Sequence, residues 1–216
     1  HPVARKLIEL SGVPIAAPSA NISGYPSPTT AQHVMRDMHG KIAAVVDGGD
    51  CRVGVESTVI ALEGEDSVRI LRPGYVTKEM LETVVPHVTL DKAILHQLQE
   101  GQTVRSPGMK YQHYSPHAHV TLIEGRWPEF AAWVQQHAEA GTYALVFDSE
   151  GADLSVPYLT YGTGDAEQAH QVFAKLRELD DIGAKRVFVR APNPNGIGLA
   201  VYNRLIRAAG FEVIQV

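Results

Sequence analysis

Residues 17–29 bring hydroxyl and amide side chains together near the start of the chain. This stretch reads Ala-Pro-Ser-Ala-Asn-Ile-Ser-Gly-Tyr-Pro-Ser-Pro-Thr. Ser19, Asn21 and Ser23 alternate by two, so they share one face if the backbone is extended. Neutral groups of this kind can cradle an oxyanion or a nucleotide, but the same composition is typical of a turn between a strand and a helix. Both interpretations stay open on the residues alone.

Two further positions have side chains suited to anions. Arg72 follows Val68-Arg69-Ile70-Leu71 and precedes Pro73-Gly74, which puts a guanidinium at the end of an expected strand. Its planar fork suits a phosphate or a carboxylate, although an arginine there can also simply be solvated. Glu56 and Ser57 would face opposite sides of an expected strand, and Ser57 suits an anion better.

Residues 103–119 interrupt the periodic pattern of the chain. They are bounded by prolines and rich in lysine, arginine, tyrosine and histidine. We interpret them as an ordered linker that carries binding groups, the alternative being a plain connection between domains.

The sequence lacks the motifs of several common catalytic mechanisms. It contains no HExxH, no phosphate-loop lysine motif and no GxSxG elbow. His113, His117 and His119 have a spacing that suggests a metal, but no carboxylate or cysteine is nearby, so we identify no metal-ligating side chains. The remaining hydroxyl, amide, arginine, tyrosine and lysine side chains can hold anions and orient reactants, but they supply no obvious nucleophile.

Bulk composition narrows the class of protein. The chain has 216 residues, 44% hydrophobic and 20% charged, with a formal net charge of −5 and one cysteine. These values predict an ordinary globular protein of the cytoplasm and do not indicate a general nucleic-acid surface. No window has the roughly 18 apolar residues that a membrane span needs. The chain begins at His1 in a helical pattern, so we expect that residues upstream are missing.

The elements that must position these side chains follow from hydrophobic periodicity. In the first half we expect helices near residues 3–11, 30–39, 77–85 and 90–100, and strands at 13–16, 42–46, 54–62 and 68–71. In the second half, strands at 120–123, 143–147, 186–189 and 212–215 alternate with helices at 128–140, 165–179 and 197–209. This alternation predicts a Rossmann-like, mostly parallel α/β domain without a GxGxxG turn.

Several motifs together resemble a known family. The motifs Ser19-x-Asn21, Asp47-Gly48-Gly49, residues 56–59 and residues 71–74 resemble the C-terminal half of a YrdC domain. Residues 106–116 and 196–205 are similar to the linker and C-terminal domain of long, two-domain threonylcarbamoyl-AMP synthases. The resemblance implies an α/β protein with three parts: the C-terminal portion of a twisted YrdC-like catalytic domain (1–100), a linker that serves as a lid (101–118) and a Rossmann-like domain (119–216).

The resemblance also implies a reaction. Such enzymes make threonylcarbamoyl-adenylate from L-threonine, bicarbonate and ATP with Mg²⁺ and release pyrophosphate, and downstream machinery modifies the tRNA adenosine beside the anticodon. It implies that Ser19 and Asn21 are catalytic and that Ala17 and Ser57 bind threonine. The implied ATP ligands are Ser19, Ser27, Arg72 and a linker tyrosine, either Tyr111 or Tyr114. The net charge does not indicate direct tRNA contact, and no membrane contact is expected.

One departure from the family pattern affects the expected activity. The family's Lys-x-Arg motif has no match upstream of Ser19. We therefore expect that the chain lacks the N-terminal half of the YrdC domain and that, alone, it is weakly active or inactive. The alternative function is a non-catalytic nucleotide- or RNA-binding module that retains the pocket. Carbamoyl transfer to another acceptor would require zinc-finger or acylphosphatase segments, which the sequence does not contain.

Overall fold

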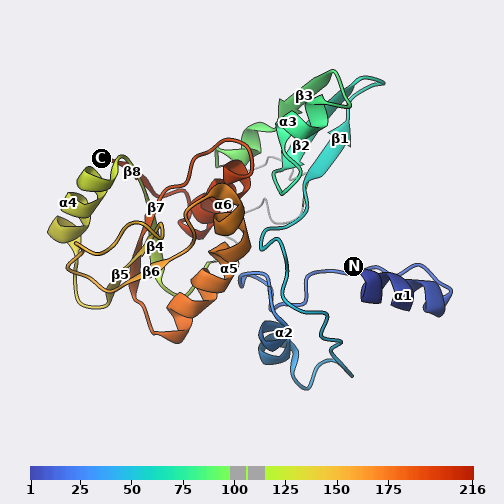
Figure 1. Cartoon of the computed structure of the whole chain (residues 1–216), viewed down its shortest axis with the longest axis horizontal. Helices are drawn as coiled ribbons and strands as arrows, with labels where there is room; N and C mark the ends of the chain where they lie inside the picture. The colour runs from blue at the N-terminus through green and yellow to red at the C-terminus, as the bar shows by residue number, and fades with distance from the viewer. Residues whose placement is uncertain (98–105, 107–114) are drawn as a thin grey trace.

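The computed structural model describes residues 1–97, 106 and 115–216 (Figure 1). Tyr111 and Tyr114 lie outside the described residues. The elements in chain order are α1 (Pro2–Ser11), α2 (Ala31–Met38), β1 (Val59–Leu62), β2 (Ser67–Arg72), α3 (Lys78–Glu82), β3 (His87–Leu90), the 3-10 helix η1 (Lys92–Ile94), β4 (His119–Glu124), α4 (Trp127–His137), β5 (Thr142–Val146), β6 (Tyr158–Thr160), α5 (Asp165–Asp181), β7 (Arg186–Arg190), α6 (Gly198–Ala208) and β8 (Val213–Gln215).

A five-stranded parallel sheet organises the C-terminal half of the chain. Its strand order is β6-β5-β7-β4-β8, and every neighbouring pair is parallel. This confirms the α/β fold with a parallel sheet that the alternating pattern predicts. The edge strand β6 was not predicted, because three residues are too few for a clear period-two pattern.

Both faces of this sheet are covered by helices, which explains why its central strands are apolar on both sides. Leu122 of β4 packs in a core with Phe173 of α5 and Leu205 of α6. Its neighbour Ile123 points to the other face and packs with Phe130 and other apolar residues of α4. Successive strand residues thus serve two separate cores.

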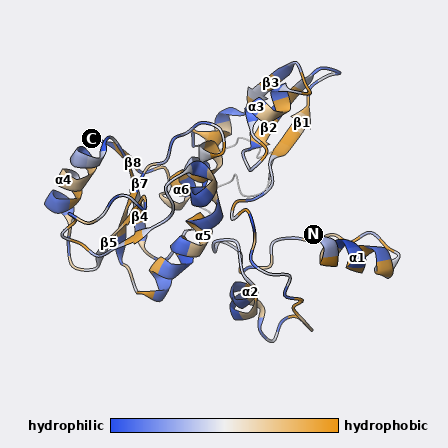
Figure 2. Ribbon diagram, in the orientation of Figure 1, coloured by the Kyte–Doolittle hydropathy of each residue, from blue (hydrophilic) through white to orange (hydrophobic). Residues whose placement is uncertain are grey.

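A smaller three-stranded sheet is formed by residues 59–90. In the order β1-β2-β3, the first pair is antiparallel and the second parallel. Val68, Ile70 and Val88 form its core with residues of η1. β1 lies at one edge and is strongly hydrophobic (Figure 2), and its Leu62 is 78% exposed.

Helix α6 lies between the two sheets (Figure 1). All eleven of its residues are buried. Ala200 and Leu205 pack in the core of the five-stranded sheet, whereas Leu199 packs in the core of the three-stranded sheet. One helix therefore contributes to both hydrophobic cores.

The polar side chains of α6 hold the chain beside η1. Asn203 and Arg207 are buried, and their side chains donate hydrogen bonds to the carbonyl oxygens of Ile94 and Ala93, the latter at 2.6 Å. Buried backbone carbonyls need such donors. α6 thereby fixes the end of the three-stranded unit.

The described part of the structure does not contain two of the strands and one of the helices that the sequence predicts. Residues 13–16 and 42–46 have no strand structure, and most of their side chains are exposed. An apolar run becomes a strand only where a neighbouring strand accepts its backbone hydrogen bonds, and neither run has such a neighbour among the described residues. The predicted helix 90–100 is replaced by the end of β3 and by η1, and residues 98–100 lie outside the described residues. The expected strand 54–62 is confined to Val59–Leu62.

The first part of the chain has little regular structure around its two helices. α1 has no buried residue and lies apart from the rest in Figure 1, with Leu7 and Leu10 among its exposed apolar side chains. The His1 imidazole meets the carbonyl oxygen of Gly48 at 3.1 Å. Within the described ranges, no helix is long and apolar enough to cross a membrane.

Gly54 is a point of close contact between the first half of the chain and α5. Its amide donates to the carbonyl oxygen of Ala169 at 2.9 Å, and a Cβ at this position would lie 2.2 Å from the carbonyl oxygen of His170. Because the obstacle is backbone, Gly54→Ala is expected to lower the free energy of unfolding by about 1–3 kcal/mol. Urea denaturation measures the change.

The matched control is Gly164→Ala, because no atom lies within 4 Å of a Cβ built at Gly164. This variant is expected to lose about 1 kcal/mol or less, because alanine is a poorer N-cap than glycine but meets no clash here. Equal stability of the two variants would contradict the close contact at Gly54.

Candidate functional site

The predicted binding stretch is folded by one of its own residues. The Asn21 side-chain amide donates to the carbonyl oxygens of Ile22 and Tyr25, at 2.9 and 3.0 Å. Gly24 has φ +91°, a left-handed conformation that glycine adopts without strain. Asn21 therefore holds residues 21–25 in a turn, so the stretch is a turn and also presents polar groups.

Two polar atoms of this stretch are buried without a partner. Asn21 Oδ1 and Ser27 Oγ make no hydrogen bond with any described part of the chain. Buried polar atoms in folded proteins are nearly always satisfied, so such atoms call for a ligand or ordered water. Ala17 and Ser19 are exposed. The stretch thus offers both accessible and unsatisfied groups.

The end of the stretch leads directly into α2. Thr30 caps this helix, since its side chain accepts a hydrogen bond from the His33 amide at 3.2 Å. The Thr29 amide donates to His33 Nδ1 at 3.2 Å, and the Thr29 carbonyl accepts from the Cys51 amide at 2.8 Å. Local hydrogen bonds therefore fix the exit of the stretch.

Ser57 and Arg72 form a second group at the end of β2. Arg72 donates from Nε and Nη2 to the Ser57 carbonyl oxygen, at 3.1 and 2.9 Å. Gly74 packs against the same loop, where a Cβ would lie 2.4 Å from the Glu56 carbonyl oxygen. The structure therefore brings Ser57 and Arg72 together, with a positive charge beside the exposed serine.

The hydrogen bonds described above do not join the two groups to each other. Ser19, Asn21 and Ser27 belong to the turn stretch, and Ser57 and Arg72 to the β2 end. Whether the two groups share one ligand stays a prediction.

Of the neighbouring side chains of Glu56 and Ser57, only that of Ser57 faces solvent, because Glu56 forms an ion pair inside the molecule. Its carboxylate pairs with Arg204 of α6 at 3.2 Å, and the Arg204 side chain is fully buried. Ser57 is exposed on the other side. The C-terminal half of the chain thus anchors the loop that carries Ser57.

A second buried arginine anchors the turn stretch. Arg177 of α5 donates to the Pro26 carbonyl oxygen and to the Asp37 carboxylate of α2. Burial alone would raise the pKa of Asp37, but the hydrogen bonds and charge of Arg177 outweigh it and hold this pKa below its ordinary value. Sequence analysis missed Arg177 and Arg204, because a charged residue on a helix ordinarily indicates a solvated face.

Tyr25 extends the same attachment. Its hydroxyl lies 2.6 Å from His117 Nε2, and the two rings meet edge to face with centroids 5.3 Å apart. The His117 amide in turn donates to the Asp180 carboxylate of α5 at 2.6 Å. The turn stretch is therefore connected to the segment that enters β4.

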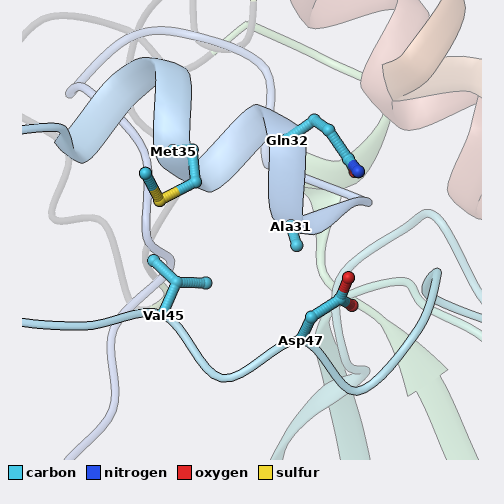
Figure 3. Close-up of a pocket in the computed structure, with 5 residues that line it drawn as sticks. All are labelled: Ala31, Gln32, Met35, Val45 and Asp47. Atoms are coloured by element: carbon cyan, nitrogen blue, oxygen red, sulfur yellow. The ribbon is translucent and has the colours of Figure 1, made fainter.

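An open pocket of about 370 Å³ lies beside α2 (Figure 3). Ala31, Gln32 and Met35 line it from the helix, and Val45 and Asp47 from the facing segment. Asp47 accepts a hydrogen bond from the Gly49 amide at 2.9 Å. Among the predicted site residues that the structure describes, none lines this pocket, so it does not locate the predicted site.

The described residues contain no group of three or more histidine, cysteine, aspartate or glutamate side chains placed to hold a metal ion. The side chains of the two groups are neutral hydroxyls, an amide and a guanidinium. These groups bind and orient anions.

Two family models match the chain in succession. The model described as "Telomere recombination", whose name includes YrdC, matches residues 1–74. The model described as "Threonylcarbamoyl-AMP synthase, C-terminal domain" matches residues 76–210, which is more than half of the chain. The chain belongs to the threonylcarbamoyl-AMP synthase family.

Relatives within the threonylcarbamoyl-AMP synthase family match this chain over its whole length. It is 40% identical to the threonylcarbamoyl-AMP synthases of Pyrococcus abyssi and Bacillus subtilis, with 100% of this chain aligned to 64% and 62% of those proteins. The crystal structure of P. abyssi Sua5 complexed with L-threonine aligns with 100% of the chain at a TM-score of 0.88 and 40% identity, covering 64% of that structure. The chain therefore spans under two thirds of the length of these relatives.

One expectation about this family was wrong. We expected the chain to lack the N-terminal half of the YrdC domain. The Telomere recombination model matches from residue 1 to residue 74, which contradicts that expectation. A short motif such as Lys-x-Arg is a poor marker of a domain boundary, because a model of the whole domain draws on many positions.

His33 is expected to make stability depend on pH. Burial, followed by the charges of Arg177 and Arg36, lowers its pKa below 6.5, against opposing effects of Asp37 and Asp181. Between the lowered pKa and 6.5 the unfolded chain binds more protons than the folded chain. The stabilisation is therefore complete above about pH 6.5 and decreases as the pH falls below it.

Urea denaturation between pH 5.0 and 7.5 measures this dependence, and His33→Gln is expected to flatten it below about pH 6.5. His87→Gln, at an exposed position on β3, is the control and should keep the wild-type slope. An unchanged slope in His33→Gln would contradict the neutral, hydrogen-bonded His33 of the structure.

Proposed function

We propose that the protein containing this chain makes L-threonylcarbamoyladenylate from L-threonine, bicarbonate and ATP and releases pyrophosphate. Its product would serve the threonylcarbamoyl modification of the tRNA adenosine beside the anticodon. The observation that carries the proposal is the alignment of the whole chain with relatives named threonylcarbamoyl-AMP synthase at 40% identity. The cytoplasmic location stays a prediction from the sequence.

The residue types suit this reaction. The amine of threonine condenses with bicarbonate to a carbamate, with loss of water. A carbamate oxygen then attacks the α-phosphorus of ATP while the bond to the β-phosphate breaks and pyrophosphate leaves. Two anions must meet in this step, so fixed donors that orient them and offset charge supply the catalysis. No covalent intermediate on the protein is required.

Specific roles are assigned to the residues of the two groups. In the turn stretch, Ser19 and Asn21 take part in catalysis and Ser19 and Ser27 hold ATP. The unsatisfied Ser27 Oγ and Asn21 Oδ1 support these assignments, because a bound ligand would complete their hydrogen bonds.

In the β2 group, Ser57 binds threonine, together with Ala17 of the turn stretch, and Arg72 faces the phosphates. The double hydrogen bond from Arg72 to the Ser57 carbonyl supports a joint site for the two substrates. A linker tyrosine, Tyr111 or Tyr114, completes the ATP site in this proposal, and the choice between them stays a prediction.

ATP enters this proposal as its Mg²⁺ complex. Mg²⁺ in sites of this kind is held mainly by substrate phosphates and water. The Mg²⁺ would neutralise phosphate charge, and the protein groups would orient the reactants.

The natural protein that carries this chain is expected to release pyrophosphate from ATP only when L-threonine and bicarbonate are both present. A coupled pyrophosphate assay, with mass spectrometry of the adenylate, measures the reaction. Ser19→Ala is expected to lower kcat/KM by about a hundredfold, the usual effect of removing one donor to developing charge.

Two outcomes would contradict this proposal. Pyrophosphate release that does not depend on threonine would exclude the synthase reaction. ATP binding in calorimetry without any turnover would favour the alternative function, a non-catalytic nucleotide-binding module.

Arg72 is expected to need its planar fork as well as its charge. Arg72→Ala should lower kcat/KM by about a hundredfold, whereas Arg72→Lys should retain an intermediate activity, because lysine keeps the charge but cannot reproduce the double hydrogen bond to Ser57. Steady-state kinetics with varied ATP and threonine measure both effects.

Arg69→Ala is the matched control on the same strand, since Arg69 pairs instead with Glu63 at 2.6 Å. It should retain wild-type kinetics. Full activity of Arg72→Lys would show that charge alone suffices at this position.

A further inference from the structure

Arg177 of α5 reaches across the molecule to the turn stretch. Its side chain is 3% exposed, and α5 and α2 lie near each other in Figure 1. Nε and Nη2 donate to the Pro26 carbonyl oxygen at 3.1 and 2.6 Å. Nη1 and Nη2 donate to the two Asp37 carboxylate oxygens at 3.0 and 2.6 Å. One guanidinium thus holds two points that are eleven residues apart along the chain.

The geometry requires arginine specifically. Four contacts from one planar group fix direction as well as distance, and a lysine ammonium cannot satisfy a carbonyl and both carboxylate oxygens in this way. Asp37 is also buried, with 5% of its side chain exposed, so neither charge has water as an alternative partner. Both charges therefore depend on each other and on the Pro26 carbonyl for their hydrogen bonds.

A neighbouring ion pair provides a natural comparison. Arg36 of α2 pairs with Asp181 of α5 at 2.5 Å, but both side chains are about half exposed. Exposed pairs contribute little to stability or position because water screens them. The same two helices are thus joined by one buried pair and one solvated pair.

The carbonyl held by Arg177 lies next to the predicted ATP-binding serine. Pro26 immediately precedes Ser27, whose Oγ is buried without a hydrogen-bond partner among the described residues. A hydrogen bond on the Pro26 carbonyl orients the peptide plane that leads into Ser27. The position of this hydroxyl therefore depends on a side chain of the C-terminal half.

We propose that Arg177 is a positioning residue, which orients the Pro26–Ser27 peptide for ATP while it pairs with Asp37. The proposal rests on the proposed function in that Ser27 binds ATP. In this proposal, a helix that packs on the five-stranded sheet positions part of the nucleotide site. Arg177 acts through the backbone and touches no substrate.

The test separates positioning from stability. In the natural protein, Arg177→Met leaves Asp37 unpaired, whereas the double variant Asp37→Leu/Arg177→Met replaces the pair by apolar groups, which is often neutral for stability. Both variants lose the donors to Pro26. In a peptide covering residues 27–31, we expect the Thr29 amide, which donates to His33 Nδ1 in the wild type, to exchange at least tenfold faster in both variants. We also expect the KM for ATP to rise at least fivefold, with a smaller change in kcat.

Arg36→Ala is the matched control and should leave exchange and KM at wild-type values. Wild-type exchange and KM in the stably folded double variant would overturn the proposal and leave Arg177 a purely structural residue. If the wild type makes no adenylate, the proposed function fails. Faster exchange of residues 27–31 in the double variant would then still support the positioning of this stretch by Arg177.

Discussion

The buried pair of Asp37 and Arg177 is the interaction on which the arrangement of the first part of the chain depends. Residues 1–58 contain two helices and no strand, so no sheet of their own holds them in place. Loss of one partner from a buried pair costs about 3–5 kcal/mol, a large share of the 5–15 kcal/mol that keeps a typical domain folded. The turn stretch therefore owes its position to a charge on another unit of the protein.

A second arginine repeats this arrangement at the other polar group. Arg204 of α6 holds Glu56, beside Ser57, as Arg177 of α5 holds Pro26, beside Ser27. The Gly54 amide adds a backbone contact to α5. Both helices cover the same face of the five-stranded sheet, so one rigid surface supports both predicted substrate-binding groups. Such support by a rigid scaffold is what precise orientation of two anions requires.

The sequence predicted the five-stranded unit well and the remainder less well. Strands β4, β5 and β7 are five or six residues long and have apolar patterns that local residues determine. The runs 13–16 and 42–46 have the same apolar character but lack strand neighbours in the described part of the chain, and a neighbour is a property of the whole fold.

For the candidate site, the sequence indicated some of the polar residues but not the buried charges that hold them in place. Ser57 and Arg72 were each identified by residue type, and the structure places them in contact. The buried roles of Arg177, Arg204 and Asp37 could not be predicted, because a single sequence does not distinguish a buried charge on a helix from a solvated one. Their partners are far away along the chain.

The burial of α6 on all sides has a consequence for how the molecule unfolds. A helix that belongs to two hydrophobic cores cannot leave one of them without exposing the other, since Leu199 packs in one core and Leu205 in the other. The two sheets are therefore thermodynamically coupled through a single element. Heating should disrupt them in one cooperative transition, so that the smaller sheet does not melt as an independent unit.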